Sequence, residues 1–255
     1  MAGGRRLVER LSRGVVLRRS LPRRFGGARL YVTPDASLRF WRPGLGHVDP
    51  RLLALVEELV RTGDSVWDIG SNVGLFAFSA AHRATNTGHV LAVEADPLLA
   101  SLLKRSSAIA DRPGAPVEVL HAAIADSTGV ARFAIAERGR ATSHLIEVGG
   151  STQTGGARFV TEVPCLTLDS LLQGRLPPAL VKVDVEGAEL LALRGGAQLL
   201  STARPRILCE VSAENRDEVG ALLHGFDYRL FDADLSSSER PALGAPAWNT
   251  LAMPA

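Results

Sequence analysis

The chain has 255 residues, of which 46% are hydrophobic and 22% are charged. This balance is typical of a globular domain with an apolar core, so it excludes a disordered or fibrous chain. Cys165 and Cys209 are its two cysteines and form no CxxC pair, which excludes a disulfide scaffold or a zinc ribbon. We expect both to be core thiols. No apolar run is long enough for a membrane span or a signal peptide, so the sequence predicts a cytoplasmic protein.

The formal net charge of +2 is the sum of two oppositely charged parts. Residues 1–48 hold eleven arginines against two acidic residues, a local charge of +9, which leaves −7 for residues 49–255. We therefore predict a basic N-terminal extension over residues 1–44 and a main domain over residues 45–255.

The N-terminal extension has a helical pattern. Apolar residues recur at helical spacing from Leu7 to Val15 among arginines, which predicts an amphipathic helix over residues 5–20. Residues 29–40 are expected to form a short hairpin. We expect the helix to pack on the acidic main domain. Contact of residues 1–20 with an anionic membrane surface is a less favoured alternative. No DNA partner is expected, since no nucleic-acid-binding motif is present and only 5% of the residues are aromatic.

The main domain alternates strands and helices. A helix is predicted at residues 50–61, and others follow several of the strands. Strands are predicted at residues 65–70, 89–95, 116–124, 180–185, 206–212, 227–233 and 248–253. Repeated β-α-β units with apolar strands predict an α/β fold with a mostly parallel sheet covered on both faces. Residues 129–165 interrupt this pattern, and we expect a mobile loop between short antiparallel strands there.

A glycine-containing turn follows the first strand of this α/β pattern. It contains Asp68, Gly70, Ser71, Asn72 and Gly74 and leads into a helix. Glycines let a ligand approach the backbone closely, and the helix N-terminus offers unpaired N–H groups. The spacing G-x-x-x-G differs from the dinucleotide fingerprint G-x-G-x-x-G, and the preceding aspartate suits a ligand with an ammonium group. The alternative is a structural turn in which Asp68 only caps backbone N–H groups.

Glu94 ends the next predicted strand, 24 residues after Gly70. In Rossmann-like sheets an acid at this position accepts the ribose hydroxyls of a nucleotide. The strand's carboxyl end is also the usual ligand edge, so we favour ribose binding over a solvated loop acid.

A group of acidic residues lies at the end of the apolar strand predicted at residues 180–185. Asp184 and Glu186 are expected at the crevice edge, whereas Glu189 starts a helix, where its charge favours the N-terminal dipole. The alternative is a capping cluster with an ion pair to Lys182. Oxygen ligands could also hold a divalent metal, but no histidine joins the cluster and no metal site is predicted.

Several segments together resemble one known family. They include "VWDIGSNVGLFAFSAA", "HVLAVEADP", "LVKVDVEGAELLALRGGAQLL" and the terminal "WNTLAMP". Over about residues 45–253 the chain resembles the FkbM family of S-adenosylmethionine-dependent methyltransferases. The resemblance implies a Rossmann-like, seven-stranded sheet, mostly parallel, with an antiparallel last strand. It also implies S-adenosyl-L-methionine as cofactor and methyl transfer to a small-molecule acceptor, a hydroxyl of a sugar or of a polyketide- or peptide-type natural product.

The family pattern also implies roles for individual residues. The methionine part of the cofactor is assigned to Asp68, Gly70, Ser71, Asn72 and Gly74. The ribose is assigned to Glu94, and the adenine to His121, Ala122 and Ala123. Asp184 and Glu186 match the acidic block beside the transferred methyl, with Asp184 also a cofactor contact. Ser71 stands where the family often has alanine, and it keeps the small size of that position.

A hydroxyl acceptor must lose its proton, so a base would assist the transfer. Candidates for this base, from their expected positions, are Asp184, Glu186, Glu210 and His144. Our hypothesis is that Asp184 orients or deprotonates the acceptor. N-methylation of a peptide or RNA, and a non-catalytic cofactor-binding protein of the same fold, remain as alternatives. Trp41 and Trp248 are expected to pack rather than line an acceptor pocket.

Overall fold

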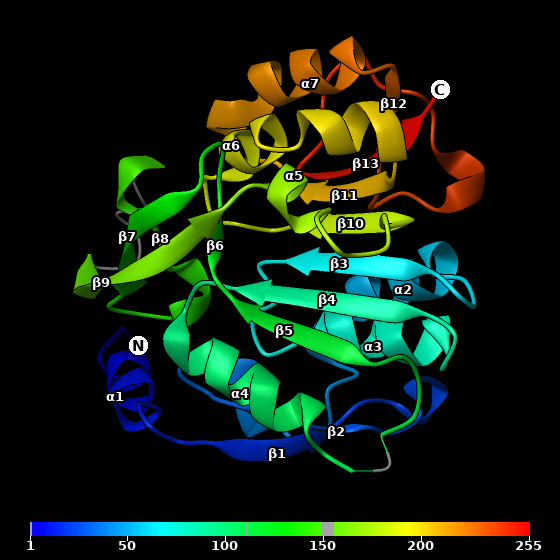
Figure 1. Cartoon of the computed structure of the whole chain (residues 1–255). Coiled ribbons are helices and arrows are strands. Elements are labelled where there is room, and N and C mark those ends of the chain that lie inside the picture. Colours follow the sequence, from blue (N-terminus) through cyan, green and yellow to red (C-terminus); the bar gives the residue numbers. More distant parts are fainter. Residues whose placement is uncertain (1, 111, 149–155) are drawn as a thin grey trace.

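The computed structural model describes residues 2–110, 112–148 and 156–255 (Figure 1). Its centre is a seven-stranded sheet. In spatial order the strands are β12 (Tyr228–Asp232), β13 (Asn249–Pro254), β11 (Arg206–Glu210), β10 (Leu180–Val183), β3 (Ser65–Ile69), β4 (His89–Glu94) and β5 (Val117–His121). The run from β11 to β5 is parallel, and β13 is antiparallel to both of its neighbours. The predicted α/β fold is confirmed.

Helices cover both faces of this sheet. Successive strand residues point to opposite faces, so Val66 and its neighbour Trp67 are buried in two different hydrophobic clusters. The helices on the Val66 side are α2 (Pro50–Leu59), α3 (Leu75–Ala84) and α4 (Pro97–Ser107). Those on the Trp67 side are α5 (Leu168–Leu171), α6 (Glu189–Arg194) and α7 (Arg216–Gly225). The sheet is therefore the middle layer of three.

Aspartate-proline pairs fix where two of these helices begin. Asp49 accepts a hydrogen bond from the Leu52 N–H at the start of α2, and Asp96 accepts one from the Leu98 N–H at the start of α4. The proline that follows each aspartate takes the first helical position, where a missing N–H costs nothing. Asp96 is thereby held beside the end of β4.

A smaller sheet lies beside the carboxyl ends of β3 and β4, at the left in Figure 1. Its strands, in spatial order, are β6 (Ala123–Ile124), β9 (Ala157–Leu166), β7 (Gly129–Ala136) and β8 (His144–Leu145). The predicted strand at residues 116–124 is thus divided between two sheets. The antiparallel strands predicted within residues 129–165 are confirmed as β7 and β9, but they are 8 and 10 residues long rather than short. Residues 149–155 of that predicted loop lie outside the described residues.

The N-terminal part differs from its prediction in two elements. Helix α1 (Ala2–Leu11) ends well before residue 20, and Leu17–Ser20 forms strand β1. This strand pairs antiparallel with β2 (Arg29–Val32), so the hairpin predicted within residues 29–40 is wrong. Alternating exposure along β1 explains its extended conformation. Leu38–Trp41 is a short 3₁₀ turn, η2, capped by the Ser37 hydroxyl.

The N-terminal part shares a hydrophobic core with the central sheet. Phe25, Leu30 and Val32 are buried in the same cluster as helices α2, α3 and α4. Strand β2 packs on α4, where the Tyr31 N–H donates to the Ser106 Oγ at 2.9 Å. The boundary predicted after residue 44 stays a prediction, although apolar packing continues across it.

The remaining predictions about single residues divide into two groups. Cys165 and Cys209 are free, buried thiols, as predicted. Trp41 and Trp248 are exposed, which corrects the expectation that both pack in the core. Among the residues described, no helix is long and apolar enough to cross a membrane.

Candidate active site

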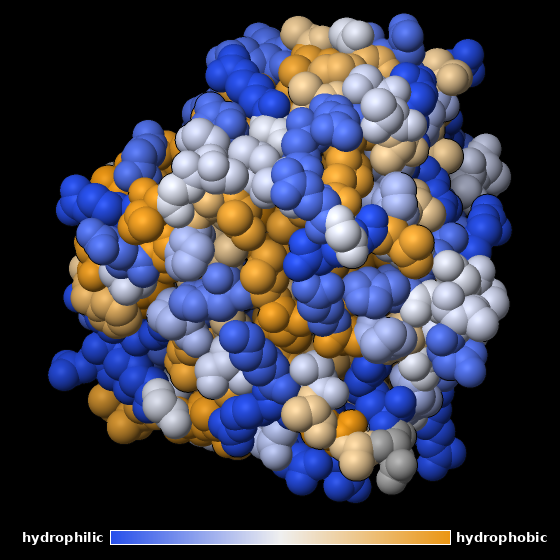
Figure 2. Space-filling model, viewed as in Figure 1, coloured by the Kyte–Doolittle hydropathy of each residue, from blue (hydrophilic) through white to orange (hydrophobic). Residues whose placement is uncertain are grey.

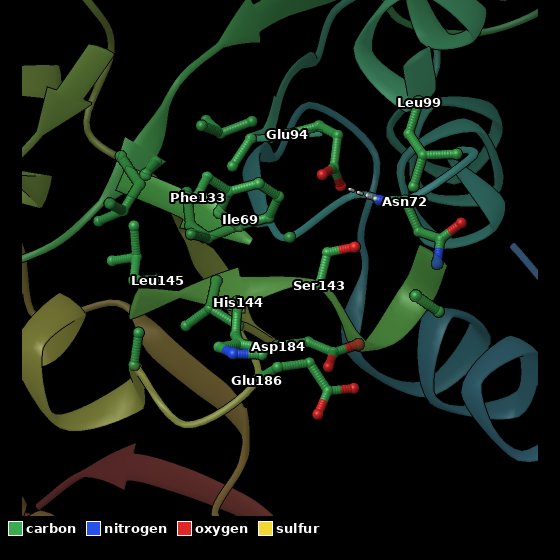
Figure 3. A pocket seen from close by; sticks show the side chains of 18 of the residues that line it. Ile69, Asn72, Glu94, Leu99, Phe133, Ser143, His144, Leu145, Asp184 and Glu186 are labelled. Carbon is green, nitrogen blue, oxygen red and sulfur yellow. Dashed lines mark hydrogen bonds between the residues drawn. The ribbon is translucent and has the colours of Figure 1, made fainter. Parts of the chain in front are cut away.

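A cavity of about 270 Å³ opens between the carboxyl ends of the central strands and the small sheet (Figure 3). Gly70 and Asn72 line it after β3, Glu94 at the end of β4, and Asp184 after β10. The small sheet and its connections contribute Phe133, Arg140, Ser143, His144 and Leu145. Ligands of open α/β sheets bind at this edge, and small-molecule sites usually have volumes of roughly 300–1,000 Å³. We identify this cavity as the candidate cofactor site.

Gly70, directly after β3, lies against the backbone of Asp184, directly after β10. Its φ is +78°, and a Cβ there would overlap the carbonyl oxygen of Asp184. Its N–H donates to the Val93 carbonyl at 2.9 Å, so the turn is fixed against β4 as well. A side chain is therefore excluded at this position, and the bare backbone forms part of the cavity wall.

Three other residues of the glycine loop support it from behind. Gly74 starts α3 with a φ of +91°, and a Cβ there would lie 2.6 Å from the Phe78 ring. The Ser71 hydroxyl donates to the carbonyl of Asp68 at 2.7 Å. None of these three residues (Asp68, Ser71 and Gly74) lines the cavity. The structure thus brings Gly70 and Asn72, but not these three, to the site.

Asp68 is completely buried beneath the loop. Its Oδ2 accepts a hydrogen bond from the Ala77 N–H at 3.1 Å, and its Oδ1 lies 3.4 Å from the Lys182 Nζ. Burial raises the pKa of its carboxyl group, and the Lys182 ammonium opposes that shift. Asp68 thus makes the contacts of the structural alternative, with a backbone N–H of α3 and with the Lys182 ammonium.

Glu94 faces the cavity with its carboxylate already held in place. Its Oε2 accepts the Asn72 N–H at 2.7 Å (Figure 3), and its Oε1 accepts the Asp96 N–H at 2.8 Å. Asn72 itself has a φ of +53°, a left-handed conformation that asparagine tolerates. Burial raises the pKa of Glu94 to about 8. Each carboxylate oxygen keeps a further lone pair that can accept a ligand hydroxyl.

The three residues assigned to adenine are not all at the cavity. Ala122 and Ala123 line it, beside the apolar side chains of Phe133 and Leu145. His121 does not, since its Nε2 lies 3.1 Å from the Ala95 carbonyl oxygen and its side chain borders α4 instead. A flat apolar ligand group would therefore contact the alanines and the small sheet.

Acidic residues gather on the side of the cavity opposite Glu94 (Figure 3). They are Asp184, Glu186 and Glu210. The Asp184 Oδ2 lies 2.9 Å from the Lys182 Nζ, which is the ion pair named in the structural alternative. Burial and the charge of Asp184 raise the pKa values of Glu186 and Glu210 to about 7. Two carboxyl groups at this edge therefore change charge near neutral pH.

His144 lies at the same end of the cavity, on strand β8 rather than on a mobile loop. It is opposite Ala134 of β7 in the antiparallel pairing. Its Nδ1 lies 3.2 Å from the Thr142 carbonyl oxygen. The structure thus brings all four predicted base candidates to one cavity.

A second cavity, of about 100 Å³, adjoins the acidic side of the first. Its polar lining includes Asp49, Arg51, Asp234 and Asn249. Asp184 and Glu210 are the two residues that line both cavities. Ligands bound in the two cavities would therefore meet beside these two carboxylates.

Sequence reasoning missed the arginine that closes the first cavity. Arg140 lines it and is almost fully buried, with Nε and Nη2 donating to Asp96 at 2.9 and 2.7 Å. Its Nη1 lies 3.7 Å from Asp35, which also accepts two hydrogen bonds from Arg158 at 2.9 and 2.8 Å. This four-residue network joins the N-terminal part, the small sheet and the start of α4. Asp96 carries a local sequence signal, since an aspartate directly before a proline is typical of a helix start.

Within residues 2–110, 112–148 and 156–255, no group of three or more histidine, cysteine, aspartate or glutamate side chains has a geometry that could hold a metal ion. The expectation of no metal site stays a prediction.

The sheet with one antiparallel strand, the glycine turn after β3 and the acid ending β4 define a Rossmann-like fold, a class in which nucleoside-containing ligands bind at this edge of the sheet. Residues 68–233 match the family model described as the methyltransferase FkbM domain. The chain therefore belongs to the FkbM methyltransferase family, as its sequence resemblance predicted.

Individual relatives are distant. The chain is 29% identical over 153 residues to the hexuronic acid methyltransferase AglP of Haloferax volcanii, a match that covers 59% of this chain and 57% of that protein. The match thus spans little more than half the length of this relative. Among solved structures, the FkbM methyltransferase of Methylobacillus flagellatus is 16% identical with a TM-score of 0.46, covering 78% of this chain and 49% of that one. Precorrin-6y C5,15-methyltransferase of Geobacter metallireducens is 12% identical with a TM-score of 0.42, covering 79% and 83%.

Proposed function

We propose that this protein is an S-adenosylmethionine-dependent O-methyltransferase that acts on a hydroxyl group of a sugar or a similarly hydroxylated natural product. The observation that carries the proposal is the meeting of two cavities at Asp184 and Glu210. One cavity suits the cofactor, the other suits a polar acceptor, and a base is available where they join.

The residues of the first cavity fit S-adenosylmethionine. The buried Glu94 carboxylate can accept both ribose hydroxyls, and the backbone of Gly70 lines the cavity where the methionine part would lie. Ala122, Ala123 and Phe133 offer an apolar surface to the adenine. When bound, the cofactor supplies an electrophilic sulfonium methyl, and transfer of that methyl to oxygen releases the thioether and the hydroxyl proton. The protein mainly positions the reactants and takes up that proton.

Glu210 is the best candidate for the base. Its pKa of about 7 lies near the expected working pH, where a carboxylate can accept a proton and still be regenerated. Asp184 stays paired with Lys182 at 2.9 Å, so we assign it the role of orienting the acceptor hydroxyl. The sequence left open whether Asp184 orients or deprotonates the acceptor, and its ion pair with Lys182 favours the orienting role.

The second cavity supports a hydroxyl-rich acceptor. Its carboxylate, amide and guanidinium groups, from Asp49, Asp234, Asn249 and Arg51, can exchange several hydrogen bonds with a sugar. The name of the relative AglP, a hexuronic acid methyltransferase, is consistent with this class. Acidic residues outnumber basic ones in the lining, which favours an uncharged sugar over a uronic acid.

The test is methyl transfer from radiolabelled S-adenosylmethionine to a panel of neutral sugars, uronic acids, amines and short peptides. We expect labelled product with a sugar hydroxyl, and loss of most activity in Asn249→Ala with unchanged cofactor affinity. Product labelled on nitrogen would instead support the N-methyltransferase alternative. Cofactor binding without turnover of any acceptor class would support the non-catalytic alternative.

A further inference from the structure

Helix α1 presents an apolar face to the outside of the molecule. Leu7, Val8 and Leu11 are 58%, 42% and 66% exposed. At about 100° per residue these three side chains share one side of the helix, while Glu9 is on the opposite side. Glu9 accepts hydrogen bonds from Arg138 of the main domain at 2.7 and 3.1 Å. The expectation that this helix packs on the main domain is therefore correct only for its polar side.

Trp41 extends this apolar face. Its ring is 42% exposed, and its Nε1 donates to the Ser12 hydroxyl at 3.0 Å, just after the end of α1. The Arg19 guanidinium donates to the carbonyls of residues 40, 41 and 42, which fixes the turn that carries the tryptophan. We call Leu7, Val8, Leu11 and Trp41 the N-terminal apolar face.

Positive charge surrounds this face. Arg10 lies on the same helix, and Arg42 comes directly after the η2 turn. Both arginines are exposed. They belong to the first 48 residues, whose net charge is +9. Where α1 lies, at the lower left of the molecule, Figure 2 shows hydrophobic side chains directly beside strongly hydrophilic ones. An apolar helix face with a tryptophan and flanking arginines is the pattern of helices that lie in a membrane interface.

We propose that the N-terminal apolar face binds the surface of an anionic lipid bilayer, with α1 lying along the interface and its arginines among the headgroups. A second copy of this chain is a poorer occupant. In a twofold contact, Arg10 and Arg42 of one copy would face the same two arginines of the other copy, and like charges repel. Nucleic acid is also poorer, since a phosphate backbone gives exposed leucines no apolar partner. This inference does not depend on the proposed methyl transfer.

Co-sedimentation of the full chain with vesicles tests the proposal. We expect binding to phosphatidylcholine vesicles that contain phosphatidylglycerol, weak binding to pure phosphatidylcholine, and release by salt. Leu7→Glu with Leu11→Glu should reduce binding by about tenfold or more. The matched control is Leu176→Glu, which places the same charge at an exposed leucine elsewhere and should bind as the wild type does. Circular dichroism verifies that each variant is folded.

Tryptophan fluorescence locates the contact. Trp41 and Trp248 are both exposed, whereas Trp67 is buried. Anionic vesicles should shift the emission of the wild type and of Trp248→Phe to shorter wavelength, but not that of Trp41→Phe. Absence of vesicle binding, equal binding by the Leu7/Leu11 double variant, or a shift that persists in Trp41→Phe would overturn the proposal. So would a stable dimer in solution that the double variant abolishes.

Discussion

Arg140 and Asp96 form a bidentate ion pair with hydrogen bonds of 2.9 and 2.7 Å, and their side chains are only 6% and 1% exposed. Asp96 also caps α4 and lies two residues after Glu94, the carboxylate that we assign to the ribose. Arg140 lines the cavity from the opposite, small-sheet side. The pair therefore connects the segment between β7 and β8 to the start of α4, at the edge of the candidate cofactor site.

We predict that Arg140→Ala destabilises the fold strongly, because it leaves the Asp96 carboxylate buried without its cation. Breaking one partner of a buried pair typically costs about 3–5 kcal/mol. Urea unfolding measures the loss. The matched control is Arg194→Ala, whose pair with Glu218 is exposed and should contribute less than about 1 kcal/mol. Equal, small losses in both variants would contradict the assignment.

Two truncations separate the functions of the N-terminal part. Deletion of residues 2–11 removes only α1 and should leave cofactor binding intact while abolishing vesicle binding. Deletion of residues 1–44 also removes Asp35, Leu30 and Val32, and we expect it to lose the cooperative unfolding transition. Differential scanning calorimetry distinguishes the two. A stable protein that binds cofactor without residues 1–44 would show that the shared core is dispensable.

The central sheet was predictable because each part of its sequence signal is local. Aspartate-proline caps, apolar strands and the glycine turn each indicate an element without reference to distant residues. The placement of Glu94 at a strand end also followed from spacing alone. What failed were pairings between distant segments. Strand β2 pairs with β1 rather than with the segment after it. The antiparallel pairing of β7 with β9 was expected, but its length, which depends on contacts across 20 intervening residues, was underestimated.

The sequence predicted where in the fold the candidate site residues lie better than it predicted which side chains contact one another. The sequence indicated which strand ends carry Asp184, Glu186 and Glu210, and parallel strands bring such ends to one edge. It left open whether Asp68 contacts a ligand or only caps backbone N–H groups, because its position depends on its contact with Lys182. It did not indicate Arg140, whose partner Asp96 is 44 residues away in the chain.

We predict that Gly70→Ala abolishes cofactor binding and destabilises the protein more than Gly174→Ala does. Both glycines have left-handed φ values, +78° and +74°, so both substitutions carry the same backbone cost of about 1–2 kcal/mol. Only at Gly70 would the new methyl group overlap the Asp184 carbonyl, since nothing lies within 4 Å of the corresponding position at Gly174. Thermal unfolding of the two variants measures the difference. Similar melting temperatures would contradict the close approach of β3 and β10.

The stability of the ligand-free protein should fall between about pH 5 and about pH 8. The pKa values of Glu94, Glu186 and Glu210 rise on folding from 4.5 to about 8, 7 and 7. In that interval the unfolded chain has already lost these protons, so the stabilisation present below pH 4.5 is lost as the folded groups ionise. Melting temperature against pH checks this. Glu94→Gln should flatten the slope, whereas Glu118→Gln, whose carboxyl has a lowered pKa, should leave it unchanged.

Methyl transfer should accelerate with rising pH through about 7, because the Glu210 carboxyl must be ionised to accept a proton. Glu210→Gln should remove this dependence and slow transfer by about 10²-fold or more, with little change in cofactor affinity. Glu186 titrates in the same range, so Glu186→Gln is the control that should keep the rising limb. If Glu186→Gln loses the limb and Glu210→Gln keeps it, the base is Glu186.

Isothermal titration of the full chain with S-adenosylmethionine tests the central assignment most directly. We predict saturable one-to-one binding that Glu94→Ala weakens by about tenfold or more, since each variant molecule loses the buried acceptor for the ribose hydroxyls. Glu118→Ala, which removes a carboxylate outside the cavity, should bind as the wild type does. Absence of binding by the wild type, or equal affinity in Glu94→Ala, would contradict the account of this cavity as the cofactor site.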